Sequence, residues 1–297
     1  MIQIRDEAAD AAYALGWAAV KRMPEPLARR LFTALGERTW RARGGGVRQL
    51  EKNLARVVGR PADSPEVREL SRTAMRSYMR YWLESFRMPV IGRDRIRDGM
   101  RVTGDQQIYD AMAKGRGVVI ALPHMGNYDH AGAWLGTQGY PITTVAERLK
   151  PESLYKRFLA YRESLGFEIL PLTGGASAFG VMARRLREPK VVCLVADRDL
   201  SETGVEVEFF GRAARMPGGP AALAVQTGAA LLPVTLWFEG DDWGARVHEE
   251  VPQPREGTRK EKTRAMTQAM ADAFAEGIAA HPADWHMMQK IWVEDLS

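Results

Sequence analysis

The pattern of apolar and polar positions changes near Gly99. Before it, apolar residues recur every three or four positions among charged ones, which predicts amphipathic helices. After it, short apolar runs alternate with stretches of helical periodicity, which is typical of a mainly parallel sheet with helices on both faces. We therefore expect an α/β protein with a mainly parallel central sheet flanked by helices and a helical N-terminal region. Residues 1–297 are treated as one domain, with a helical part at 1–98 and an α/β core at 99–297.

The same periodicities predict the individual elements. In the N-terminal part, helices are expected at 6–43 with a break near Pro24 and Pro26, at 47–58 and at 66–86. In the α/β part, strands are expected at 102–104, 118–122, 142–146, 168–171, 191–196, 205–210 and 231–238, and helices at 108–114, 131–138, 152–165, 176–186, 221–227 and 258–280.

The stretch VVIALPHMGNYD, residues 118–129, organises the α/β part. Its apolar run is typical of a strand buried on both faces, and Pro123 ends that strand. His124 then stands at the carboxyl end of the strand. Asn127 is a candidate N-cap, which puts Asp129 in the first turn of the next helix. We expect the Asp129 carboxylate to hold one ring nitrogen of His124 as N–H, leaving the other as a base for a hydroxyl.

Two other interpretations of these residues stay open. A lone histidine beside a strand end is more often a structural residue than a catalyst. His130 suggests a metal site together with His124 and Asp129. No third ligand stands at a familiar spacing and there is no HExxH motif, so no metal is expected.

Basic residues gather in the N-terminal part. Lys plus Arg exceed Asp plus Glu by 42 to 37 in the whole chain, but between Arg29 and Arg60 only Glu37 and Glu51 are acidic. Such a patch suits phosphates of anionic lipids, of a nucleotide-bearing cofactor or of nucleic acid. Four further arginines recur every fourth residue, as one stripe that is either a solvated helix face or a phosphate-facing one: Arg68, Arg72, Arg76 and Arg80.

Two features bear on the cellular setting. The single Cys193 lies inside the apolar run VVCLVA, where a buried small side chain is expected; one cysteine forms no disulfide within a chain, which is compatible with a reducing cytosol. The apolar run Ala11–Val20 is too short to span a bilayer. If the protein meets a membrane, we expect it to lie on the surface, with the helix face near Trp17 and the patch from Arg29 to Arg60 in contact.

Polar residues follow three predicted strands, where open α/β sheets bind their ligands. Arg162 belongs with them, because it lies on the side of its helix that packs against the sheet and must either reach solvent or pair with Glu147, Asp197 or Asp199. An ion pair with no chemical role is the alternative for Arg162. The residues at the three strand ends are His124, then Glu147 and Arg148, then Asp197, Arg198 and Asp199.

These residues also carry a resemblance to a known family. HMGNYD resembles the H-x-x-x-x-D motif of glycerolipid-type acyltransferases, and GVVIALPHMGNYDHAG is similar to the branch that contains lipid A late acyltransferases and actinobacterial phosphatidylinositol mannoside acyltransferases. Further similar segments are AERLKPESLYKRFLAYRESLG, ADRDLSETGVEVEFFGRAARMPGGPAALAVQTGAALLPV and HPADWHMMQKIW. The ADRD and FFG blocks resemble the mannoside enzymes more. At the closing segment the lipid A branch usually has a tryptophan-rich, arginine-containing run, whereas this chain has His286, Met287, Met288 and Lys290.

The resemblance implies transfer of a long fatty acyl chain from acyl-coenzyme A to a sugar hydroxyl of a membrane glycolipid, the 6-hydroxyl of a mannose in the mannoside branch. His124 is then the general base and Asp129 its orienter. Acyl-coenzyme A is a co-substrate, no cofactor is bound permanently, and the protein is peripheral on the cytoplasmic face of an anionic membrane. The residues that the resemblance carries over as a shell that binds the acceptor or orders the base are Glu147, Arg162, Asp197, Arg198 and Asp199.

Three rival functions are retained at this point. One is a lipid A-type late acyltransferase. An acyl-coenzyme A thioesterase uses the same His124 and Asp129 with water in place of the sugar. A basic module for nucleic acid uses only the arginines, and we do not expect a nucleic-acid partner.

Overall fold

A seven-stranded sheet forms the centre of the protein, in the order β1-β9-β8-β2-β5-β3-β4. The computed structural model describes residues 16–146, 159–171, 178–199 and 204–296. Neighbouring strands are parallel except β8 and β9, which are antiparallel, so the mainly parallel α/β architecture is confirmed. The strands are β1 (Met100–Thr103), β2 (Val118–Leu122), β3 (Ile142–Ala146), β4 (Glu168–Pro171), β5 (Val191–Val195), β8 (Ala230–Glu239) and β9 (Asp242–Val247).

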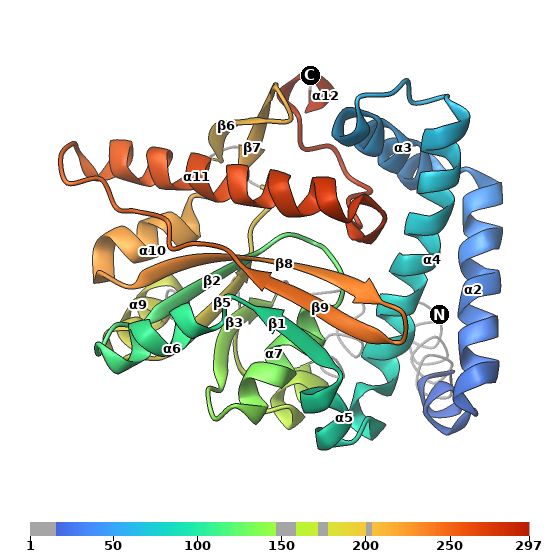
Figure 1. Cartoon of the computed structure of the whole chain (residues 1–297), viewed down its shortest axis with the longest axis horizontal. Coiled ribbons are helices and arrows are strands. Elements are labelled where there is room, and N and C mark those ends of the chain that lie inside the picture. The colour runs from blue at the N-terminus through green and yellow to red at the C-terminus, as the bar shows by residue number, and fades with distance from the viewer. Residues whose placement is uncertain (1–15, 147–158, 172–177, 200–203, 297) are drawn as a thin grey trace, which may run out of the picture.

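Helices cover both faces of this sheet (Figure 1). The strand β2 explains why: Val119 and Ala121 belong to the hydrophobic cluster on one face, whereas Ile120 and Leu122 belong to the cluster on the other. A strand between two apolar layers needs apolar residues at every position, which is the continuous run that the sequence shows. The covering helices are α6 (Gln106–Ala113), α7 (Tyr128–Thr137), α9 (Ala178–Arg187), α10 (Gly219–Thr227) and α11 (Arg259–Ala280).

The N-terminal part forms a helical layer at one end of the sheet. Figure 1 shows α2 (Glu25–Ala42), α3 (Gly45–Val58) and α4 (Pro65–Arg87) beside the end towards which β8 points, which is the carboxyl end of the parallel strands. The short helix α5 (Arg93–Asp98) then leads into β1. Ser64 caps α4 by accepting from the Val67 amide at 3.3 Å, so the helix begins where its first unpaired N–H groups find a partner. The predicted break near Pro24 is confirmed, because residues 16–22 are helical and α2 begins at Glu25.

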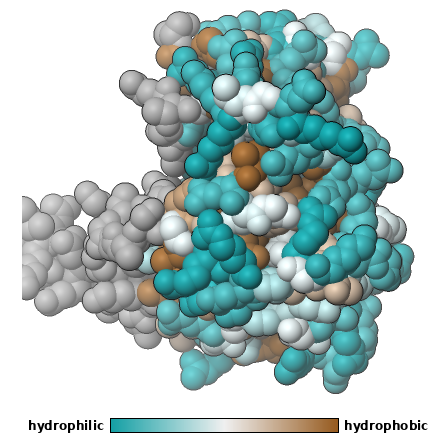
Figure 2. Space-filling model, turned by 90° about the vertical axis from the view of Figure 1, so that its left-hand side faces the viewer, coloured by the Kyte–Doolittle hydropathy of each residue, from teal (hydrophilic) through white to brown (hydrophobic). Residues whose placement is uncertain are grey.

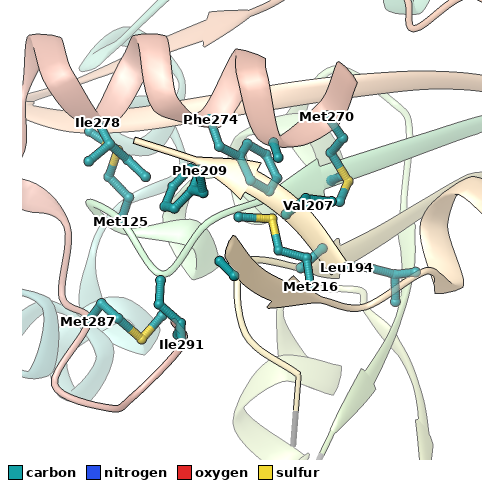
Figure 3. Packing of buried hydrophobic residues seen from close by; sticks show 14 of the residues in the cluster. Met125, Leu194, Val207, Phe209, Met216, Met270, Phe274, Ile278, Met287 and Ile291 are labelled. Carbon is teal, nitrogen blue, oxygen red and sulfur yellow. The ribbon is translucent and has the colours of Figure 1, made fainter. Parts of the chain in front are cut away.

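Two strands, β7 (Arg212–Met216) and β9, were not predicted from the sequence. β7 forms a hairpin with β6 (Val205–Phe209), and these two strands make a separate antiparallel sheet. Figure 3 shows its Phe209 and Met216 packed against Phe274 of α11. β7 and β9 escaped the prediction because each contains a charged residue or a glycine among few apolar ones, and their burial comes from packing with distant elements. The expected helices at 6–15 and 152–158 lie outside the described residues.

The surfaces of the molecule differ in polarity. Figure 2 views the side that carries the amino ends of the strands, and it is mostly hydrophilic with scattered apolar residues. No helix in the part of the chain that the structure describes is long and apolar enough to cross a membrane.

Candidate active site

His124 and Asp197 meet at the carboxyl edge of the sheet. β2 and β5 are parallel neighbours in which Leu122 lies opposite Val195, so the residues two positions further along lie level with each other. His124 Nδ1 is 2.5 Å from Asp197 Oδ1, and the His124 backbone N–H donates to Asp197 Oδ2 at 2.9 Å. The Trp285 indole N–H also donates to Oδ2, at 2.9 Å. Sheet register therefore brings together two residues that are 73 positions apart.

The electrostatics of this pair favour a proton on Nδ1. Asp197 is fully buried, and burial alone would raise the pKa of its carboxyl. The attraction of His124 and the hydrogen bonds from His124 and Trp285 outweigh burial and lower the pKa of Asp197. An ionised carboxylate only accepts hydrogen bonds, so Nδ1 donates and Nε2 keeps its lone pair. The His124 side chain is 30% exposed, and Nε2 has no hydrogen-bond partner within the described residues.

The expected contact between Asp129 and His124 is wrong. Asn127 caps α7 as predicted, its side chain accepting from the His130 amide at 2.9 Å, and Asp129 lies in the first turn. That turn directs the buried carboxylate to Arg162, whose Nε is 2.9 Å from Oδ1 and whose Nη2 is 3.3 Å from Oδ2. Arg162 was expected to pair with an acid at a strand end, and its partner is instead the aspartate of the motif. The carboxylate that contacts the His124 ring comes from β5.

Two tyrosines separate the Asp129–Arg162 pair from His124. The hydroxyls of Tyr81 and Tyr128 are 2.5 Å apart, and Tyr81 also donates to Asp129 Oδ2 at 3.4 Å. The Tyr128 ring stands edge-on to the His124 ring, with centroids 6.3 Å apart. Burial, followed by the nearby Asp129 charge, raises the pKa of Tyr128, so its hydroxyl stays protonated. Sequence analysis missed both tyrosines, since only the packing of α4 against α7 brings them to the site.

A segment near the C-terminus completes the floor of the site. It pairs with the loop after β2 almost as an added strand, which fixes the backbone on which His124 stands. Sequence analysis found this segment by resemblance but assigned it no contact. The contacts are an antiparallel bridge between Met125 and Trp285, the Gly126 N–H donating to the Asp284 carbonyl at 2.9 Å, and the His286 N–H donating to the His124 carbonyl at 2.8 Å.

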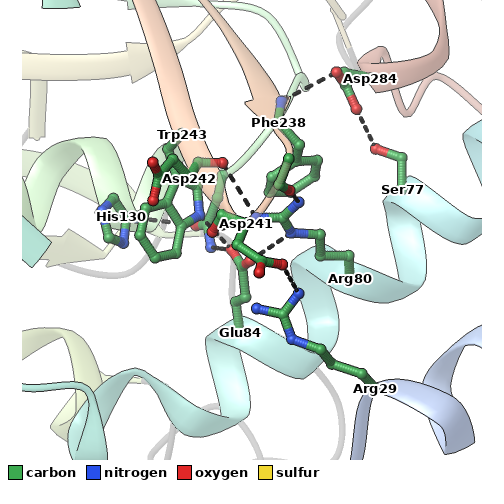
Figure 4. A network of polar contacts seen from close by, with 12 residues as sticks. Arg29, Ser77, Arg80, Glu84, His130, Phe238, Asp241, Asp242, Trp243 and Asp284 are labelled. Carbon is green, nitrogen blue, oxygen red and sulfur yellow. Dashed lines mark hydrogen bonds and ion pairs between the residues drawn. The ribbon is translucent and has the colours of Figure 1, made fainter. Parts of the chain in front are cut away.

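Glu84 on α4 connects the loop after β2 to the N-terminal helical layer. Figure 4 shows its carboxylate between Arg80 and the indole of Trp243. It accepts from Arg80 Nε at 2.7 Å, from Trp243 Nε1 at 2.7 Å and from the side-chain amide of Asn127 at 2.7 Å. The residue that caps α7 is therefore held from outside its own loop.

The arginine stripe of α4 is committed to ion pairs. Arg68, Arg72 and Arg76 have acidic partners on α2 or α3, which the sequence around the stripe does not show. Neither a solvated face nor a phosphate-facing one describes it well. The pairs are Arg68 with Glu51, Arg72 and Arg76 with Glu37, and Arg80 with Glu84.

The other candidate residues lie as follows. The Arg198 guanidinium contacts the Gln289 side chain, and Asp199 packs against Gly204. Glu147 lies outside the described residues. His130 is fully buried and stacks on Trp243 with ring centroids 3.7 Å apart. Within the described ranges, no three His, Cys, Asp or Glu side chains are grouped to hold a metal ion.

Comparison with known proteins shows the family of the chain. Residues 2–294 match the family described as bacterial lipid A biosynthesis acyltransferase. A Mycolicibacterium smegmatis protein named phosphatidylinositol mannoside acyltransferase is 52% identical over 298 residues, covering 100% of this chain and 95% of the relative. A Mycobacterium tuberculosis protein of the same name is 54% identical over 294 residues, covering 98% and 90%. The chain therefore belongs to the bacterial lipid A biosynthesis acyltransferase family, and it is an acyltransferase.

Proposed function

We propose that this protein transfers a long fatty acyl chain from acyl-coenzyme A to the 6-hydroxyl of a mannose of a phosphatidylinositol mannoside. The names of the relatives support the acceptor, and the observation that carries the chemistry is the His124–Asp197 pair. A sugar hydroxyl is a weak nucleophile and needs a base when it attacks a carbonyl. His124 Nε2 is that base, and Asp197 holds the ring in the tautomer that leaves Nε2 free.

The reaction needs no covalent enzyme intermediate. His124 Nε2 takes the hydroxyl proton as the sugar oxygen bonds to the thioester carbonyl carbon. The tetrahedral species then breaks its carbon–sulfur bond, and the proton passes from His124 to the departing thiolate. A thiolate with an ordinary pKa near 8.5 leaves readily, so the base is the main requirement. The charge of Asp197 stabilises the imidazolium that exists between the two proton transfers.

A small apolar cavity of about 40 Å³ suits part of the acyl chain. It lies between β2, β5 and α7, and two of its lining residues, Leu122 and Tyr128, adjoin the catalytic loop. An alkyl chain is stabilised by leaving water for such a lining. Burial raises the pKa of the Cys193 thiol to about 12, so this cysteine acts as an apolar wall and not as a nucleophile. Other lining residues are Ile120, Ala131 and Trp134.

We also propose that α2 rests on the anionic cytoplasmic face of the membrane. Three leucines four residues apart make an apolar ridge along α2: Leu27 is 54% exposed, Leu31 41% and Leu35 41%. Arg30 and Arg38 are exposed beside this ridge. Leucines with flanking arginines are the composition of an interfacial helix. The apolar contact expected at Trp17 is corrected, because Trp17 is buried against Phe86, to whose carbonyl its indole donates.

Labelled palmitoyl-coenzyme A tests the reaction. Purified protein is incubated with the label alone, with a phosphatidylinositol mannoside, with the same glycolipid in its 6-deoxymannose form, and with a lipid A precursor. The proposal expects labelled product with the first glycolipid alone. Equal thioester turnover with and without any glycolipid indicates the thioesterase, and labelled lipid A precursor indicates the other acceptor class; either result rejects the mannoside assignment.

Flotation with vesicles tests the membrane contact. The wild type is expected to float with vesicles that contain anionic lipid and to be released in part by high salt, since each basic residue near the surface contributes about 1 kcal/mol before screening. Leu31→Ser should reduce flotation. Val58→Ser, which removes an apolar side chain that is 36% exposed on α3, is the matched control and should not. Protein that stays in the supernatant at every lipid composition removes the membrane from this account.

A further inference from the structure

A second hydrogen-bond chain lies beside the His124–Asp197 pair. The Ser77 hydroxyl is 2.6 Å from Asp284 Oδ1 and 2.8 Å from His286 Nε2. The other oxygen of Asp284 accepts the Phe238 backbone N–H at 3.1 Å. Figure 4 shows Ser77 of α4 pointing at Asp284, and Asp284 in turn at Phe238. The chain therefore runs from β8 through Asp284 and Ser77 to a second histidine.

Counting protons along this chain fixes the tautomer of His286. Both oxygens of the Asp284 carboxylate accept, so the single hydrogen of the Ser77 hydroxyl goes to Asp284. Ser77 Oγ can then only accept from His286, and His286 Nε2 must carry the hydrogen. His286 Nδ1 is left with a lone pair and has no hydrogen-bond partner in the described part of the chain.

The His286 ring is linked to His124 through a circuit of neighbouring side chains. Its centroid is 5.5 Å from that of Tyr78 and 6.2 Å from that of Tyr81. Tyr81 contacts Tyr128, whose ring stands against His124, and the His286 backbone N–H closes the circuit on the His124 carbonyl. His286 lies opposite His124 across the antiparallel bridge of Met125 with Trp285, so the two side chains extend from the same side of that bridge, and His286 is 8% exposed.

We propose that His286 Nδ1 accepts a hydrogen bond from the acceptor hydroxyl next to the one that reacts, which is the 4-hydroxyl if the 6-hydroxyl is acylated. The identity of this hydroxyl rests on the proposed function; the acceptor character of Nδ1 does not. His286 is thus a specificity-determining residue that holds the sugar while His124 takes the proton.

Two other roles of His286 do not fit the geometry. A ring nitrogen with a lone pair repels a developing oxyanion, so His286 does not stabilise the tetrahedral intermediate. Burial, followed by repulsion from His124, lowers the pKa of His286 to about 3, which makes it too weak a base to take a proton from a sugar. A neutral acceptor on the same side as His124 can still align a hydroxyl.

Transfer kinetics with paired acceptors test the contact. With the wild type, a 4-deoxymannose acceptor should lose about 3- to 10-fold in kcat/KM relative to the full acceptor, the effect of one neutral hydrogen bond. His286→Phe keeps the ring and its contacts with Tyr78 but removes both nitrogens, and it should discriminate between the two acceptors by less than about 2-fold. An undiminished discrimination in this variant overturns the proposal.

Two further variants complete the kinetic test. His281→Phe is the matched control, because His281 stacks on Trp237 with centroids 4.4 Å apart, and it should discriminate like the wild type. Ser77→Ala removes the partner that fixes the tautomer, so it should lower the discrimination even if His286→Phe fails to fold. Discrimination that is unchanged in Ser77→Ala contradicts the proton count on which the inference stands.

Nitrogen NMR of the five histidines separates this inference from the proposed function. In protein labelled with ¹⁵N-histidine, long-range ¹H–¹⁵N spectra should show His286 with an unprotonated Nδ1, assigned by its loss in His286→Phe. Methyl α-D-mannopyranoside should move the Nδ1 signal towards that of a hydrogen-bonded acceptor, and the 4-deoxy analogue should not. A protonated Nδ1, or no response to the mannoside, overturns the proposal whether or not acyl transfer is observed. If the wild type transfers no acyl group to any mannoside, the proposed function fails and this spectrum still decides the role of His286.

Discussion

Asp129 and Asp197 are both buried carboxylates that hold a basic side chain, and they do opposite work. Asp197 holds His124, whose side chain is partly exposed and whose Nε2 keeps a lone pair that can accept a proton. Asp129 holds Arg162, a cation whose pKa burial alone would lower but which the Asp129 charge raises further above its ordinary value. The first pair can pass a proton on, and the second cannot. Closeness in sequence to a histidine is thus a poor guide to which carboxylate serves it.

The largest effect expected from this comparison is on catalysis. His124→Ala should lower kcat/KM by about 10²- to 10⁴-fold, the usual worth of a general base. Asp197→Asn should cost a similar factor, because two N–H donors hold Oδ2 and the new amide nitrogen must then replace Oδ1 and donate to Nδ1. That amide forces the ring proton onto Nε2. The check is steady-state transfer per folded molecule, with folding followed by circular dichroism.

Asp129→Asn is the matched variant on the other pair. It should keep kcat/KM per folded molecule within about 10-fold of the wild type, because Asp129 does not contact the His124 ring. A folded Asp129→Asn protein that is as inactive as His124→Ala, beside an active Asp197→Asn protein, would restore the role that the sequence motif suggested.

The second effect is on stability and belongs to the other pair. Asp129→Asn should lower the free energy of unfolding by about 3–5 kcal/mol, because it leaves the buried Arg162 charge without its partner. Arg162→Met in the same background should recover much of the loss by removing that charge. Urea unfolding of the two single variants and the double variant gives the coupling energy. Additive effects would show that the pair is not a structural unit.

A smaller contrast comes from the residues that support each carboxylate. Trp285→Phe removes one donor from Asp197 and should lower kcat/KM by about 10-fold, the worth of one hydrogen bond to a charged group. Tyr81→Phe removes a long contact of 3.4 Å to Asp129 and should change kcat/KM by less than about 3-fold. The two variants are compared at a saturating concentration of acyl-coenzyme A. Equal losses in both would mean that the two carboxylates act as one network.

The smallest expected effect is a loss of folding stability in acid, which comes from His130, the residue after Asp129. Burial, with repulsion from Arg95 and Arg80, lowers the pKa of His130 from 6.5 to about 3. Between these values the unfolded chain binds a proton that the folded protein does not, so stability is lost as pH falls below 6.5. His130→Phe removes this term and should make the loss between pH 6 and pH 5 smaller by about 1 kcal/mol. Urea unfolding at both values measures it; an unchanged loss would show that His130 protonates in the folded state.

The sequence alone determined the elements whose apolar spacing is local and strong. Strands β2, β3 and β4 begin and end at the predicted residues. In β2 the reason is that a strand buried on both faces needs an unbroken apolar run, which Pro123 ends. The position of His124 at a strand end and the capping role of Asn127 follow from the same few residues. These features depend on backbone sterics and on hydrogen bonds within four or five positions, which a sequence displays directly.

Only the tertiary structure decided which groups meet. Asp197 reaches His124 through the register of two strands that are adjacent in the sheet but separated by more than 60 residues. Arg68, Arg72 and Arg76 of α4 find acids on α2 or α3, and α4 and α7 each supply one tyrosine of the site. Trp17 is buried while the leucines of α2 are exposed, although both follow the same helical period. The periodicity shows that a helix has an apolar side; how the helices pack decides which part of that side is covered, and that depends on contacts between segments far apart in the chain.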